Sequence, residues 1–156
     1  MARHPGFPFA PRSTAYVRPG DFWAIPTRRG GWYCCGLVLA NEVLDVSPRR
    51  SLIVGLIDWC GPEPPTSENI AGCSVLEYGI AHVKTIRETG GVLLGHRQLE
   101  TDAGLDALLG RRSLYDCSVW GYRFIEGVAH EHFGRHFPEQ PPYASERPVP
   151  TVRGDR

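Results

Sequence analysis

Three histidines and a glutamate lie close together in the stretch HEHFGRH near the end of the chain. Imidazole nitrogens are common zinc ligands and a neighbouring carboxylate can act as a general base. His130, His132 and His136, with Glu131, therefore form a candidate site for a small metal-dependent hydrolase. The spacing departs from the HExxH motif, because position 134, where its second histidine is needed, is glycine. We predict no metal here and keep the hydrolase as an alternative.

The thiols give no ligand set. The chain has five cysteines, Cys34, Cys35, Cys60, Cys73 and Cys117. An odd number with two adjacent members is unlike a disulfide framework. Adjacent strand residues point to opposite faces, so Cys34 and Cys35 cannot bind one ion without distortion. We expect small buried side chains and no cofactor.

One lysine stands in the whole chain, in the stretch HVKTIRETGG. A lysine activated by burial could form a Schiff base or bind phosphate, with Arg87 beside it. We favour a simpler interpretation, in which Lys84 and Arg87 form the polar edge of a strand before a Gly-Gly turn. Asp58, beside Trp59 in an apolar stretch, is expected to pair with an arginine such as Arg87 or Arg123.

The elements that would position these residues are mostly short strands. Strands are expected at 21–26, 32–40, 51–59 and 118–127, extended segments at 74–86 and 91–96, and helices at 67–71, 101–110 and 125–134. This order predicts a mainly β (α+β) fold, a strongly bent antiparallel sheet or small open barrel with two or three short helices. We expect a flexible segment at 1–17, one domain at 18–137 and a proline-rich flexible tail at 138–156.

The stretch WYCCGLVLA is apolar on both of its faces. Trp32, Cys34, Gly36 and Val38 share one face, and Tyr33, Cys35, Leu37 and Leu39 share the other. Such a strand belongs in the middle of a sheet that is covered on both sides. Packing explains this aromatic cluster without catalysis.

Charge and hydropathy exclude several classes of protein. The 156 residues include 17 basic and 17 acidic side chains, so the formal net charge is zero. This balance predicts neither nonspecific nucleic-acid binding nor binding to a membrane surface. No apolar stretch approaches the ~20 residues that span a bilayer. The N-terminus lacks the apolar segment of a secretory signal, so a cytoplasmic protein is expected.

At GDFWAIP and GWYCCGLVL the chain resembles the Imm26 family of immunity proteins from bacterial polymorphic toxin systems. The shared pattern is a Gly-Asp-aromatic strand that ends in Ile-Pro, followed by an aromatic-x-x-Gly-x-Val-Leu strand. Here these residues are Gly20, Asp21, Phe22, Ile25, Pro26, Tyr33, Gly36, Val38 and Leu39. The resemblance implies a protein that is not an enzyme and that binds and neutralises one cognate toxin domain in the cytoplasm of the producing cell.

Such an inhibitor needs exposed contact residues on a stable scaffold. We assign this role to Arg28, Arg29, Trp59 and Glu63, which stand in two loop regions. Oligomeric state is left open. A regulatory module with a small-ligand pocket lined by Trp23, Trp59 and Trp120 remains a further alternative.

Overall fold

The computed structural model describes residues 3–27, 31–41, 49–99 and 118–134, and also the short strands β7 (Thr151–Val152) and β8 (Gly154–Asp155). The helix expected at 101–110 lies outside the described residues. So does the tail expected at 138–156, apart from β7 and β8.

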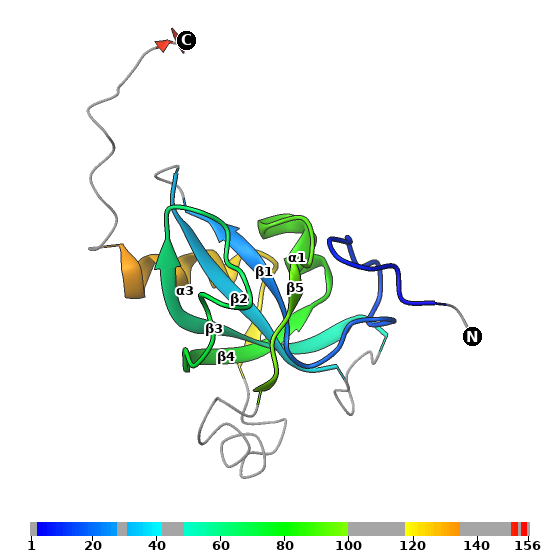
Figure 1. Ribbon diagram of the computed structural model, residues 1–156. Helices are drawn as coiled ribbons and strands as arrows, with labels where there is room; N and C mark the ends of the chain where they lie inside the picture. The colour runs from blue at the N-terminus through cyan, green and yellow to red at the C-terminus, as the bar shows by residue number, and fades with distance from the viewer. Residues whose placement is uncertain are drawn as a thin grey trace.

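Six strands form one sheet in the order β5-β1-β2-β3-β4-β6 (Figure 1). They are β1 (Asp21–Pro26), β2 (Tyr33–Ala40), β3 (Ser51–Gly61), β4 (Val75–His82), β5 (Gly95–His96) and β6 (Val119–Trp120). The sheet is not closed. Neighbours from β5 to β4 pair antiparallel, and β6 pairs parallel with β4, so the sheet is mixed. The predicted mainly β fold with short helices is confirmed.

Strand β2 lies at the centre of the sheet, between β1 and β3, as its two apolar faces predict. Cys34 and Val38 pack into one core cluster with Trp23, and Cys35 and Leu37 pack into a second cluster on the opposite face. Gly36 faces Trp23 so closely that an added Cβ would lie 2.5 Å from the indole ring. Residues 34–39 are therefore interior packing, and the partly buried Trp32 packs against the first cluster.

The sheet bends where β3 leaves regular register. Cys34 pairs with Cys60, but Gly36 pairs with Leu56, so two steps along β2 correspond to four along β3. Extra residues of this kind raise the local twist and bend the strand. Strand β3, with 11 residues, pairs with β2 along one edge and with β4 along the other.

Two helices cover one face of the sheet within the described residues. Helix α1 (Lys84–Thr89) occupies positions where an extended segment was expected. The expectation was wrong because Thr85, Ile86 and Thr89 share a buried side of a helical turn.

Helix α3 (Phe124–Phe133) confirms the helix expected at 125–134. Ile125, Val128, Ala129 and Phe133 bury its apolar side against the sheet. The strand expected at 118–127 is wrong beyond Trp120, because only two of its residues pair with β4 before the chain turns into the helix.

Two further segments differ from the expected pattern. Residues 67–72 form turns rather than a helix, and Thr66 and Asn69 hydrogen-bond each other there. Near the N-terminus, Phe9 exchanges backbone hydrogen bonds with Leu93 at 3.2 and 2.8 Å, and Val17 is buried. Part of the segment expected to be flexible therefore packs against the domain.

Candidate partner-binding site

Four basic or imidazole side chains gather where β3 begins and β4 ends. The Val83 N–H donates to the Arg50 carbonyl oxygen at 2.6 Å, which places Arg50 beside the end of β4. His82 is the last residue of β4, and Lys84 and Arg87 lie one turn apart on α1. The β-pairing of Ser51 with His82 fixes this junction. The four groups therefore stand on regular elements and their direct connections.

The structure holds His82 in its neutral form. Its Nδ1 accepts the backbone N–H of Lys84 at 2.9 Å, so Nδ1 carries no proton and the neutral ring keeps its proton on Nε2. Burial lowers the pKa of His82, and Arg50, Arg87 and Lys84 lower it further. At neutral pH the ring is therefore a hydrogen-bond donor surrounded by three cations.

An exposed tyrosine lies directly against this cluster. The ring of Tyr122 contacts His82 edge-on, with 5.5 Å between the two centroids. Lys84 Nζ lies 5.1 Å from the centroid of the same ring, which is a cation–π distance. Tyr122 is 45% exposed, and its neighbours in the sequence, Val119 and Phe124, are 79% and 52% exposed. We call Arg50, His82, Lys84, Arg87 and Tyr122 the basic–aromatic face.

The three cations of this face have no carboxylate partner in the described part of the chain. The described residues include no ion pair for Arg50, Lys84 or Arg87, whereas Arg18 and Arg123 each pair with a carboxylate. Unneutralised cations raise the electrostatic potential of the surface around them and attract an anionic partner.

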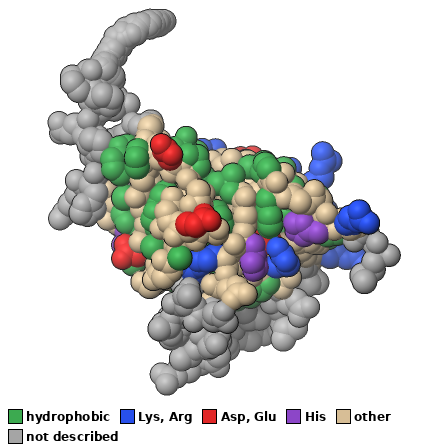
Figure 2. Space-filling view, in the orientation of Figure 1, with side chains coloured by type: hydrophobic (Ala, Val, Ile, Leu, Met, Phe, Trp, Pro, Cys, Tyr) green, Lys and Arg blue, Asp and Glu red, His purple; other side chains and the backbone are tan. Residues whose placement is uncertain are grey.

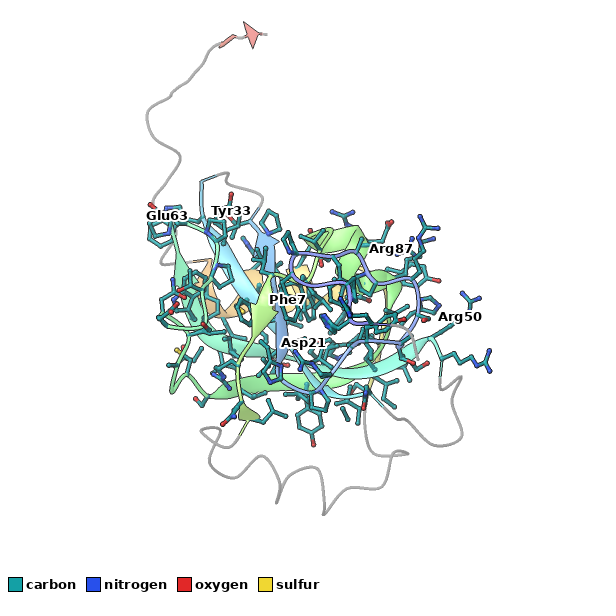
Figure 3. All side chains as sticks on the ribbon, turned by 45° about the vertical axis from the view of Figure 1, so that its right-hand side comes forward. Phe7, Asp21, Tyr33, Arg50, Glu63 and Arg87 are labelled. Atoms are coloured by element: carbon teal, nitrogen blue, oxygen red, sulfur yellow. The ribbon has the colours of Figure 1, made fainter. Side chains whose placement is uncertain are left out.

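Apart from Glu88 on α1, several exposed carboxylates of the described residues lie toward the other end of β3. Arg50 precedes β3 and Glu63 follows it, so the length of an 11-residue strand separates them. Figure 3 shows Arg50 and Arg87 toward one side and Glu63 at the opposite side. On the face drawn in Figure 2, acidic side chains lie toward the left, and most basic and imidazole side chains toward the right. On the face that Figure 2 draws, the charges of the described residues are therefore unevenly distributed.

Two of the four contact residues expected from the sequence are among the described residues, and neither belongs to this face. Trp59 is half-buried against the second core cluster and Glu63 is exposed beyond the end of β3. Arg28 and Arg29 lie outside the described residues. The contact role of all four stays a prediction.

The histidine cluster does not assemble a metal site in the described part of the chain. His132 Nε2 lies 2.5 Å from Glu77 Oε2, so this histidine leaves the candidate triad and pairs with β4 instead. His130 is exposed on α3, and His136 lies outside the described residues.

Burial holds the thiols of Cys34 and Cys35 in their protonated form. Burial raises the pKa of Cys34 to about 12, and the cross-strand neighbour Cys60 adds to the shift. The fully buried Cys35 has its pKa raised well above the ordinary value, again by burial first. A thiolate nucleophile is disfavoured at both positions.

Two acids of the sheet have different environments. Asp21 is fully buried and accepts the backbone N–H of Arg18 at 2.9 Å, while its other oxygen lies 2.9 Å from His96 Nδ1. These contacts join β1 to β5 and satisfy the buried carboxylate. Asp58 is exposed and forms no ion pair with Arg87 or Arg123 in the described structure, so the pairing suggested with these two arginines is not formed.

One cavity of about 110 Å³ lies between the end of β1 and α3. Ile25, Thr27, Gly127 and His130 are among its lining residues. None of the three tryptophans of the alternative ligand pocket lines it. Trp23 and Trp120 are buried in the first core cluster, and Trp59 packs against the second, on the opposite face of the sheet.

Comparison with protein-family models, with curated proteins and with solved structures found no match. Separately, among the helices that the structure describes, none is long and apolar enough to cross a membrane.

The sequence had placed Lys84 and Arg87 at a polar strand edge and had given Arg50, His82 and Tyr122 no role. A usable signal was the spacing of Lys84 and Arg87, three residues apart, which suits one face of a helical turn. Nothing in the sequence around Tyr122 predicted that it joins this face, because only the parallel pairing of β6 with β4 brings it to His82.

Proposed function

We propose that this protein is an immunity protein that binds and neutralises one cognate toxin domain and is not an enzyme. It acts in the cytoplasm of the toxin-producing cell. The resemblance of the first two strands to the Imm26 family suggested this function, and the basic–aromatic face is the observation that carries it.

The composition of this face suits protein recognition. Tyrosine and arginine are enriched among the residues that dominate binding energies at protein interfaces. Tyr122 is exposed yet oriented by His82 and Lys84, so little side-chain freedom is lost when a partner covers it. Val119 and Phe124, within three residues of it in the sequence, add exposed apolar surface.

The face also rests on a firmly packed support. Trp23 Nε1 donates to Thr89 Oγ1 at 2.9 Å, which joins α1 to the sheet. At Gly90, directly after α1, an added Cβ would lie 1.9 Å from the Ala24 carbonyl oxygen, so the chain passes very close to β1. An inhibitor that works by shape needs such a preorganised surface.

The test is binding and rescue with the toxin domain encoded beside this gene. The chain should bind the purified domain and restore growth to cells that express it. Tyr122→Ala should weaken binding by about 2 kcal/mol, as for a central interface aromatic. Tyr16→Ala, at another exposed tyrosine, is the matched control. Failure of the unaltered chain to bind the domain or to restore growth contradicts the proposal.

A further inference from the structure

The polar groups of the basic–aromatic face are donors almost throughout. Arg50, Lys84 and Arg87 carry charged donors and no acceptors. His82 would normally supply an acceptor, but the Lys84 N–H occupies its Nδ1 and leaves Nε2–H as a donor. Tyr122 alone adds a hydroxyl, which can donate or accept. The complementary ligand is rich in acceptors and negatively charged.

Carboxylates and phosphates both fit that description, and the surroundings favour carboxylates. Proteins that bind duplex DNA through its backbone make roughly 6–10 phosphate contacts along a basic stripe. Here three cations form a compact group, with the carboxylate of Glu88 next along α1. Val119 and Phe124, close to Tyr122 in the sequence, are exposed apolar side chains, and such surface suits a protein interface better than a charged backbone.

We propose that the basic–aromatic face docks an acidic protein surface, one that places carboxylates on Arg50, Lys84 and Arg87 around an apolar contact with Tyr122. This inference rests on the proposed function, in which that surface belongs to the toxin domain. It also restricts the mode of inhibition. A basic face is repelled by a cationic, phosphate-binding groove, so the protein binds an acidic region of the toxin and does not mimic nucleic acid.

The first experiment needs no toxin. The full chain, labelled with nitrogen-15, is titrated with short poly-L-glutamate and, separately, with a short DNA duplex at low salt. Polyglutamate should shift the signals of His82, Lys84 and Tyr122, and its affinity should fall roughly tenfold when salt screens the charges. Tighter binding of the duplex at this face, or no response to polyglutamate there, overturns the inference.

Matched triple variants test the location. Arg50→Gln with Lys84→Gln and Arg87→Gln should weaken polyglutamate binding by roughly tenfold or more. Asp58→Asn with Glu63→Gln and Glu68→Gln changes three exposed acids in and beyond the far part of β3. Compared in about 0.1 M salt, where the Debye length is only about 10 Å, this variant should keep the affinity within about twofold. If both variants lose the same amount of polyglutamate affinity, the basic–aromatic face is not the binding site. The thermal midpoint of each variant shows whether it is folded.

The same two variants, assayed against the neighbouring toxin domain, separate this inference from the proposed function. If the toxin domain binds the unaltered chain and the basic-to-glutamine variant equally well, the proposed immunity function stands. The proposal that the basic–aromatic face docks an acidic surface is then overturned. If the toxin domain does not bind at all but polyglutamate still binds at the face, the proposed immunity function is contradicted. The inference that the face binds an acidic partner then still holds.

Discussion

The indole N–H of Trp23 donates a hydrogen bond to the hydroxyl of Thr89 at 2.9 Å, across a sequence separation of 66 residues. That hydroxyl in turn donates to the Thr85 carbonyl oxygen at 2.7 Å, one helical turn back. Strand β1 and helix α1 are therefore joined by a buried polar contact inside an otherwise apolar cluster. Because α1 carries Lys84 and Arg87, this contact also positions the basic–aromatic face.

Thr89→Val should lower the free energy of unfolding by about 1–3 kcal/mol, because the buried indole N–H loses its acceptor. Urea denaturation measures the change. Thr85→Val is the control: Thr85 is also buried on α1, but its hydroxyl has no partner among the described residues. Its replacement should be neutral or slightly stabilising. Equal losses in the two variants would show that the indole bond is unimportant.

Two glycines in regular elements should respond in opposite directions to alanine. At Gly36 the new Cβ would lie 2.5 Å from the Trp23 ring, so Gly36→Ala should cost about 1–3 kcal/mol or prevent folding. At Gly127, inside α3, nothing lies within 4 Å of the new Cβ. Gly127→Ala should therefore stabilise the protein by about 0.5–1 kcal/mol through helix propensity. Thermal unfolding followed by circular dichroism measures both, and a destabilised Gly127→Ala would contradict the packing described for α3.

Stability should fall as the solution is acidified through the titration range of His82. Burial and the three neighbouring cations lower its pKa in the folded protein below the ordinary value of 6.5. The unfolded chain then binds more protons in the window between the two values. The contribution of His82 is present above pH 6.5 and is lost as pH falls through that window to the lower, folded-state pKa.

His82→Asn should remove this part of the pH dependence, because the amide oxygen can still accept the Lys84 N–H but does not titrate. The free energy of unfolding, measured by urea denaturation from pH 8 to pH 5, gives the comparison (roughly the range over which histidine titrates). If the stability of the Asn variant depends on pH as steeply as that of the unaltered chain, His82 is not the group responsible.

The buried thiols should resist alkylation in the folded protein. The pKa of Cys34 is raised to about 12 by burial and by Cys60, so almost no thiolate forms near neutral pH. Cys60 is partly exposed and should be modified before Cys34. Brief treatment with iodoacetamide followed by peptide mass spectrometry measures the order, and labelling in urea shows that both sites are reactive once unfolded. Early labelling of Cys34 would contradict its burial.

The local pattern was enough to predict the central sheet. The alternation of apolar residues in WYCCGLVLA places Cys34 and Cys35 on opposite faces, and the structure buries them in separate clusters. The proline and glycines around 19–31 correctly predicted that two strands would pair. These features depend on neighbours a few residues apart, so a single sequence carries them.

Residues 84–89 show where that approach failed. This stretch is too short for the periodicity of a helix to be distinguished from that of an extended strand. Helix α1 forms there because Thr89 hydrogen-bonds Trp23 and Ile86 is buried in the core. In the same way, the pairing expected for Asp58 failed because the charge environment of a side chain depends on segments that are distant in sequence.

By itself, the sequence determined the mainly β class, the buried middle strand and the position of α3, because periodicity and turn residues act over short distances. Only the tertiary structure decided that Arg50, His82, Lys84, Arg87 and Tyr122 form one surface. Strand pairing brings three separate segments together, and charge–charge and ring contacts depend on distances in space that spacing along the chain does not encode.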